Sequence, residues 1–98
     1  MSSGGDHDRS LKEWLQVFVQ SPQLRDKLYL KRIEKIWADT MGPAIVQYTR
    51  RIKLDQRRLI LYIDSAPLKS ELTIMKASII GTINEKLGEE FIQEVIIY

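Results

Sequence analysis

The sequence predicts an α+β fold, a two-layer sandwich in which helices cover one face of a small three-stranded mixed sheet. Apolar residues recur at helical spacing in the first 41 residues and again over residues 68–87. Between and after these stretches they alternate with polar residues, which is the period of a strand. The predicted order of elements is therefore α-α-β-β-α-β, and 98 residues are enough for one domain.

Two regions are expected along the chain. Residues 1–9 contain glycine, serine and charged residues without an apolar anchor, so we expect a flexible N-terminal tail. Residues 10–98 are expected to form the single domain, and the chain as a whole is 44% hydrophobic and 29% charged. The apolar runs are far too short to span a membrane. No membrane partner is expected, and the predicted location is the cytoplasm.

The N-terminal part of the domain is predicted to contain two helices. A capping-box pattern begins the first helix at Ser10, and a serine–proline pair begins the second at Pro22. Gly42-Pro43 ends the second helix, because glycine closes a helix and proline cannot continue it. The apolar stripes consist of Leu11, Trp14, Leu15 and Phe18 in the first helix and Leu24, Leu28, Ile33, Ile36, Trp37 and Met41 in the second.

The remainder of the chain is predicted to form a hairpin, one long helix and a last strand. Alternation predicts two strands joined by a tight turn at residues 55–57. A single continuous helix then begins at Ser65-Ala66-Pro67 and ends at Gly88. Residues 91–98 form the third strand, which a right-handed crossover can place parallel to a hairpin strand. The stripe of the long helix consists of Leu68, Leu72, Met75, Ile79, Ile83 and Leu87.

The outer face of the predicted sheet combines cations with apolar side chains. Alternation along each strand directs one set of side chains toward the helices and the other set away from them. The outward set is too apolar for a surface that only contacts water, which indicates a binding surface. Its predicted members are Arg51, Lys53, Arg58, Ile60, Tyr62, Ile96 and Tyr98.

The charge is distributed unevenly along the chain. The formal net charge is only +2, but residues 25–58 contain ten Lys or Arg against four acids. Residues 59–98 contain three Lys against six acids, so the chain has a basic middle and an acidic end. Such an asymmetry is typical of a protein with one surface that attracts polyanions.

The basic middle segment supplies the candidate nucleic-acid-binding residues. Cations on the hairpin would contact phosphates, cations on the second helix would extend that patch, and a tyrosine would stack on a base. Two alternatives stay open: the cations only solubilise the hairpin and helix, or the first helix covers the outer face with Trp14 and Phe18. The candidates are Arg50, Arg51, Lys53, Arg57 and Arg58 on the hairpin, Lys31, Arg32 and Lys35 on the helix, and Tyr62.

The composition argues against an enzyme. The chain has no cysteine, and its one histidine, His7, lies in the predicted tail. Phosphate-binding glycine loops and the zinc-protease motif do not occur. We therefore expect a non-enzymatic binding module, with no catalytic residue, no metal site and no cofactor.

Four short motifs, in a fixed order and spacing, together resemble the DciA family. The resemblance covers roughly residues 10–98. It rests on Trp37-x-x-x-Met41-Gly42-x-Ala44-Ile45-x-x-x-Thr49, Leu59-x-Leu61-x-Ile63-Asp64-Ser65-Ala66, Glu71-Leu72-x-x-Met75-Lys76 and Ile83-Asn84-x-x-Leu87-Gly88. Most of these positions are interpreted as structural.

The resemblance implies a bacterial protein with a KH-like domain that binds DNA and the replicative helicase and helps to load it. DNA is favoured over RNA, and a DNA-binding role would place the protein at the nucleoid. One alternative is a protein-interaction module that docks a helicase segment, or a second copy as a weak homodimer, through the outer sheet face or the sheet edge. Another is an RNA-binding KH-like protein, although the G-x-x-G loop of KH domains is absent.

Overall fold

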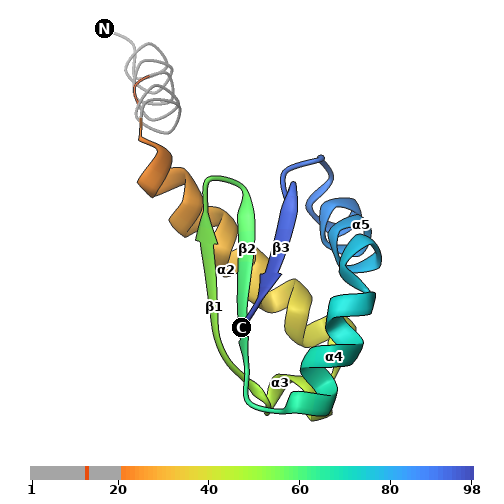
Figure 1. Cartoon of the computed structure of the whole chain (residues 1–98). Coiled ribbons are helices and arrows are strands. Elements are labelled where there is room, and N and C mark those ends of the chain that lie inside the picture. The colour runs from red at the N-terminus through yellow and green to blue at the C-terminus, as the bar shows by residue number, and fades with distance from the viewer. Residues whose placement is uncertain (1–12, 14–20) are drawn as a thin grey trace, which may run out of the picture.

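The computed structural model describes residue 13 and residues 21–98. The predicted tail and, apart from residue 13, the predicted first helix lie outside the described residues. Figure 1 shows helices packed beside a three-stranded sheet, which confirms the α+β class. The described elements are α2 (Pro22–Met41), α3 (Pro43–Val46), β1 (Thr49–Asp55), β2 (Arg58–Ile63), α4 (Ala66–Ile74), α5 (Lys76–Leu87) and β3 (Glu94–Ile97).

The sheet has the order β1-β2-β3 and is mixed, as predicted. Strands β1 and β2 are antiparallel, whereas β2 and β3 are parallel and joined by α4 and α5. The hairpin turn consists of Gln56 and Arg57, which both have positive φ angles, 51° and 66°. Two such residues form the turn whose twist matches that of the flanking strands.

The hydrophobic core lies between one face of the sheet and the helices. Side chains from alternate positions of β2 are buried against residues of α2 and α5, as strand periodicity predicts. Figure 1 shows α2 crossing behind the sheet and α5 lying beside β3. The buried residues are Ile33, Trp37, Leu59, Leu61, Ile63, Leu72, Ile79, Ile83, Leu87, Phe91, Ile92 and Val95.

Trp37 joins α2 to the start of β1. Ser21 caps α2 at its start and Gly42 ends it. Trp37 lies in the last turns of this helix, where its side chain contacts Thr49, the first residue of β1. The Trp37 indole donates a hydrogen bond of 3.0 Å to the Thr49 hydroxyl, which donates one of 2.9 Å to the Ile45 carbonyl. This chain of bonds holds α2, α3 and β1 together and satisfies a polar group of a side chain that is 1% exposed.

The prediction of one continuous helix after the hairpin is wrong. The helix breaks at Met75, whose φ and ψ of −95° and 12° leave the helical range, and forms α4 and α5. Met75 is 42% exposed and its neighbour Ile74 is 85% exposed. A straight helix of this length would extend about 33 Å, whereas β2 extends only about 20 Å. The break lets both α4 and α5 pack against the sheet. Packing against the sheet therefore requires the break, and the continuous apolar stripe in the sequence gives no sign of it.

The last strand is shorter than predicted, because the segment before it is a tethered loop. Asn84 of α5 donates a bond of 2.9 Å to the Ile92 carbonyl and accepts bonds from the N–H groups of Phe91 and Ile92, at 3.2 and 2.8 Å. Phe91 and Ile92 are buried, but their backbone groups bond to this side chain rather than to a strand. Strand β3 therefore begins at Glu94.

Two glycines of α5 are expected to respond oppositely to alanine. Gly81 lies within the helix and Gly88 ends it with a φ of +81°; a Cβ at either position meets open space. Gly81→Ala is expected to stabilise the fold by about 0.5–1 kcal/mol, because alanine favours helix. Gly88→Ala is expected to destabilise it by about 1–2 kcal/mol, because a Cβ disfavours the left-handed conformation. Urea unfolding of both variants checks the signs, and shifts of the same sign would contradict the assignment.

Candidate nucleic-acid interface

The hairpin positions cations and apolar side chains in rows across the outer face of the sheet. Arg51 lies opposite Tyr62, and Lys53 lies opposite Ile60, which is followed by Ile96 of β3. Residues directly opposite in adjacent strands share a face of the sheet. The cations of β1 therefore border an apolar strip that β2 and β3 contribute.

Two tyrosines form the aromatic part of this face. The rings of Tyr62 and Tyr98 stack with centroids 5.4 Å apart and planes inclined by 27°. The guanidinium of Arg50 lies 5.8 Å from the Tyr62 ring centroid, so a cation adjoins the stack. Tyr98 is 57% exposed, which leaves part of the stack open to a ligand. The alternative in which Trp14 and Phe18 cover this face concerns side chains outside the described residues.

The hairpin cations differ in how far neighbouring acids neutralise them. Arg51 and Lys53 are exposed and form no ion pair with any described residue. Arg50 lies 3.8 Å from the carboxylate of Asp64. Arg58 donates a hydrogen bond of 3.0 Å to the carboxylate of Asp55, its neighbour across the turn. Arg51 and Lys53 are therefore the cations most available to a polyanion.

Arg57 lies at the hairpin tip and contacts an aromatic cluster. Its guanidinium is 5.3 Å from the ring centroid of Phe91, and that of Arg25 is 5.8 Å from the same centroid. Tyr29 stacks on Phe91 at 3.9 Å, with the two rings nearly parallel. The cluster joins the hairpin tip, the start of α2 and the loop before β3. The sequence does not predict that Arg25 and Phe91 belong to this cluster. Nothing in either segment indicates that the two side chains lie in contact, because the residues are far apart in the sequence.

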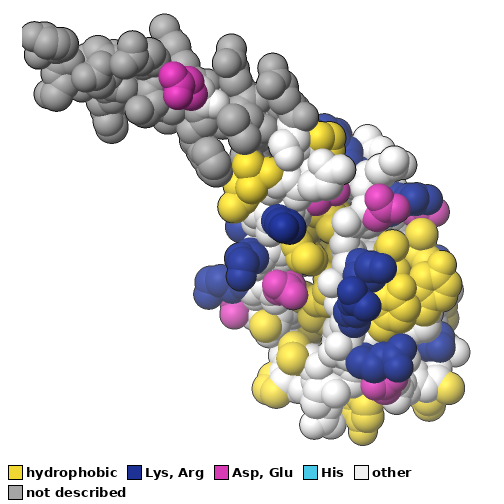
Figure 2. Space-filling model, turned by 90° about the vertical axis from the view of Figure 1, so that its left-hand side faces the viewer, with side chains coloured by type: hydrophobic (Ala, Val, Ile, Leu, Met, Phe, Trp, Pro, Cys, Tyr) yellow, Lys and Arg dark blue, Asp and Glu magenta, His cyan; other side chains and the backbone are white. Residues whose placement is uncertain are grey.

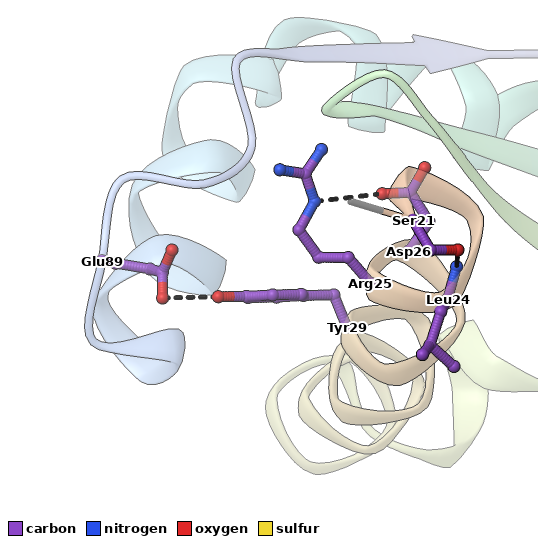
Figure 3. Close-up of polar contacts among 6 residues, drawn as sticks. All are labelled: Ser21, Leu24, Arg25, Asp26, Tyr29 and Glu89. Carbon is purple, nitrogen blue, oxygen red and sulfur yellow. Dashed lines mark hydrogen bonds and ion pairs between the residues drawn. The ribbon is translucent and has the colours of Figure 1, made fainter. Parts of the chain in front are cut away.

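A polar contact joins α2 to that loop, and a second lies within the first turns of α2 (Figure 3). The Tyr29 hydroxyl donates a hydrogen bond of 2.6 Å to the Glu89 carboxylate, and Arg25 lies 3.9 Å from the carboxylate of Asp26. Burial, reinforced by the Glu89 carboxylate, raises the pKa of Tyr29 above its ordinary value. The phenol therefore keeps the proton that it donates to Glu89, and the hairpin tip docks on a fixed cluster.

The three predicted cations of α2 do not join the outer face. Helix α2 packs on the inner face of the sheet, so its exposed side points away from the tyrosines. Arg32 donates a hydrogen bond of 3.1 Å to the Leu87 carbonyl at the end of α5, where a helix dipole favours a cation. Lys35 lies 3.4 Å from Asp39, and Lys31 is exposed. Their part in nucleic-acid binding stays a prediction.

Seen from the β1 side, the surface divides into distinct zones. Figure 2 shows Lys and Arg side chains in the middle of this view, bordering a hydrophobic patch on the right. A second basic group lies on the left, with hydrophobic atoms in the band between the two groups. The cations, apolar side chains and tyrosines of this face come from the hairpin and from β3 with the residue after it. They are Arg50, Arg51, Lys53, Ile60, Tyr62, Ile96 and Tyr98, here called the outer-face site.

The part of the chain that the structure describes has neither a metal cluster nor a membrane-crossing helix. Over residue 13 and residues 21–98, no three His, Cys, Asp or Glu side chains gather closely enough to hold a metal ion. Among the same residues, no helix combines the length and the apolar character that crossing a membrane requires. The outer-face site itself consists of cations, apolar side chains and two stacked tyrosine rings.

Comparison with known proteins identifies the family. No curated protein and no solved structure matches the chain. A family model described as "Dna[CI] antecedent, DciA" matches residues 10–97, nearly the whole length of the chain. The match includes every motif on which the resemblance rests and every residue of the outer-face site except Tyr98. The chain therefore belongs to the DciA family.

Proposed function

We propose that this domain binds nucleic acid, with DNA favoured over RNA, through the outer-face site. The observation that carries the proposal is the position of Arg51 and Lys53, two exposed cations without acidic partners among the described residues, beside the stacked rings of Tyr62 and Tyr98. Cations contribute sequence-independent affinity by releasing counterions from phosphates. Exposed aromatic rings add about 1–3 kcal/mol for each base that stacks on them.

The preference for DNA and the biological setting rest on the family. The resemblance implies a role in assisting the replicative helicase, and DNA is the substrate on which that helicase is placed. Purified cognate helicase, assayed for loading on a forked DNA with and without this protein, tests that part of the proposal. An unchanged amount of loaded helicase would contradict it.

Reversing the charge of Arg51 and Lys53 together is expected to weaken DNA binding strongly. The variant Arg51→Glu with Lys53→Glu should bind about ten- to hundredfold more weakly, because two attractive interactions with phosphates become repulsive. The slope of log affinity against log salt should flatten by about one for each phosphate that the variant no longer neutralises. Fluorescence anisotropy with labelled single-stranded and duplex DNA, between about 50 and 200 mM salt, measures both quantities.

A matched control separates this site from net charge. Lys76→Glu with Lys86→Glu makes the same change in net charge on α5, away from the outer-face site. This control should retain most of the affinity, with a salt slope close to that of the original protein. If both double variants bind DNA equally, the outer-face site is not the interface.

A further inference from the structure

The first strand of the sheet has a free edge. Strand β1 is outermost in the order β1-β2-β3, and no other described strand lies beyond it (Figure 1). Its seven residues are long enough to template another strand. An edge of this kind receives extended peptides in many recognition domains, with backbone bonds for affinity and side-chain pockets for specificity.

The hydrogen bonds of β2 show which backbone groups point toward the free edge. Leu61 accepts a bond of 2.8 Å from Tyr98, and Ile63 donates one of 3.0 Å to Tyr98, so these positions of β2 face β3. The intervening positions of β2 therefore bond to Arg51 and Lys53 of β1. By alternation, the N–H and C=O groups of Ile52 and Leu54 point away from β2. No described residue forms a hydrogen bond with them.

Two hollows lie along the inner side of this edge, between β1 and α2. One measures about 210 Å³ and is bordered by Trp37, Ala38 and Ile52. The other measures about 240 Å³ and is bordered by Leu30 and Leu54. An added strand would direct every second side chain toward the inner side. Apolar side chains at those positions would enter the hollows beside Ile52 and Leu54.

Charge differs between the two sides of the edge. On the outer side stand Arg51 and Lys53, which have no acidic partner among the described residues. On the inner side the hollows are bordered by charges of both signs: Glu34, Arg50 and Arg51 in one case, and Asp26, Lys27 and Asp55 in the other. An added strand would therefore carry acidic side chains outward and neutral apolar side chains inward. Opposite charges across neighbouring strands are favourable, and like charges are unfavourable.

The same charges argue against a second copy of this chain as the occupant. Pairing β1 with β1 of another copy would place Arg51 and Lys53 of the two copies near one another on the same face. Nucleic acid is also a poor occupant, because its backbone carries no N–H and C=O groups in the register of a strand. The features of the edge fit an extended segment of a partner protein.

We propose that the β1 edge binds an extended peptide in which apolar residues alternate with aspartate or glutamate. The peptide adds a fourth strand beside β1. Its backbone bonds to Ile52 and Leu54, its apolar side chains fill the hollows along α2, and its carboxylates face Arg51 and Lys53. This inference does not depend on DNA binding, although a bound peptide would compete with phosphates for the same two cations.

Binding of a synthetic peptide tests the edge directly. A labelled peptide with alternating valine and glutamate should bind at least about tenfold more tightly than a peptide of the same composition with its valines in one block. Replacing each glutamate by lysine should abolish binding. Saturating peptide should slow hydrogen exchange of the Ile52 and Leu54 amides relative to Lys53, whose amide already bonds to β2. Equal affinities for the two arrangements, or unprotected Ile52 and Leu54 amides, would overturn the proposal.

A variant that fills one hollow separates this proposal from the DNA site. Ala38→Phe is expected to weaken binding of the alternating peptide by about tenfold or more while leaving DNA affinity within about twofold. Ala77→Phe, on the exposed side of α5, is the matched control and should change neither. Arg51→Glu with Lys53→Glu should weaken both ligands. Unchanged peptide binding by Ala38→Phe would refute the peptide site, whatever the DNA result.

Discussion

Replacing Trp37 with alanine is expected to lower the free energy of unfolding by about 3–5 kcal/mol. The indole is 1% exposed and belongs to the core that α2 forms with the sheet, so its removal leaves a large cavity. Domains of this size are usually stable by only about 5–15 kcal/mol, so the variant should unfold at a much lower urea concentration. Urea unfolding followed by circular dichroism measures the shift in midpoint.

Two milder variants separate the cavity from the missing hydrogen bond. Thr49→Val keeps the size of the side chain but removes the acceptor of the Trp37 indole N–H and one donor to the Ile45 carbonyl, which keeps its bond from the Tyr48 N–H. It should lower the free energy of unfolding by about 1–3 kcal/mol. Trp37→Phe should fall between these variants. If Thr49→Val is as damaging as Trp37→Ala, the hydrogen-bond chain rather than packing dominates, contrary to this expectation.

Replacing Asn84 with alanine is expected to lower the free energy of unfolding by about 2–4 kcal/mol. The amide makes three hydrogen bonds to the backbone of Phe91 and Ile92, and both residues are buried. Alanine would leave the N–H and C=O groups of Ile92 without these bonds, although the Phe91 N–H keeps its bond of 3.0 Å to the Glu89 carbonyl. It would also release the loop that leads into β3. The urea midpoint should therefore fall, and amides of β3 should exchange faster.

The control for Asn84 is an exposed amide side chain outside any such network. Gln47→Ala, at the end of α3, should change the free energy of unfolding by less than about 0.5 kcal/mol. An Asn84→Ala variant as stable as this control would show that water replaces the missing bonds. That result would contradict the anchoring role assigned to Asn84.

The sequence predicts which types of residue the candidate site contains, but not which of the hairpin cations are free to take part in it. The sequence placed five cations on one hairpin, and alternation placed Arg51, Lys53 and Tyr62 on its outer face. It could not show that Arg58 pairs with Asp55 or that Arg57 lies over the Phe91 ring. Those contacts depend on the turn geometry and on a loop far away in the sequence. The strand pattern also does not reveal the hollows beside α2, because they arise from packing between two elements.

The sequence by itself determined the local structure of this protein. Caps and breakers set the bounds of α2, alternation determined the hairpin and its faces, and Gly88 closed α5, because each of these depends on interactions within a few residues. Only the tertiary structure decided the break at Met75, the late start of β3 and the docking of the hairpin tip on Phe91. In each of these cases the local pattern permitted two conformations, and contacts between distant segments stabilised one of them.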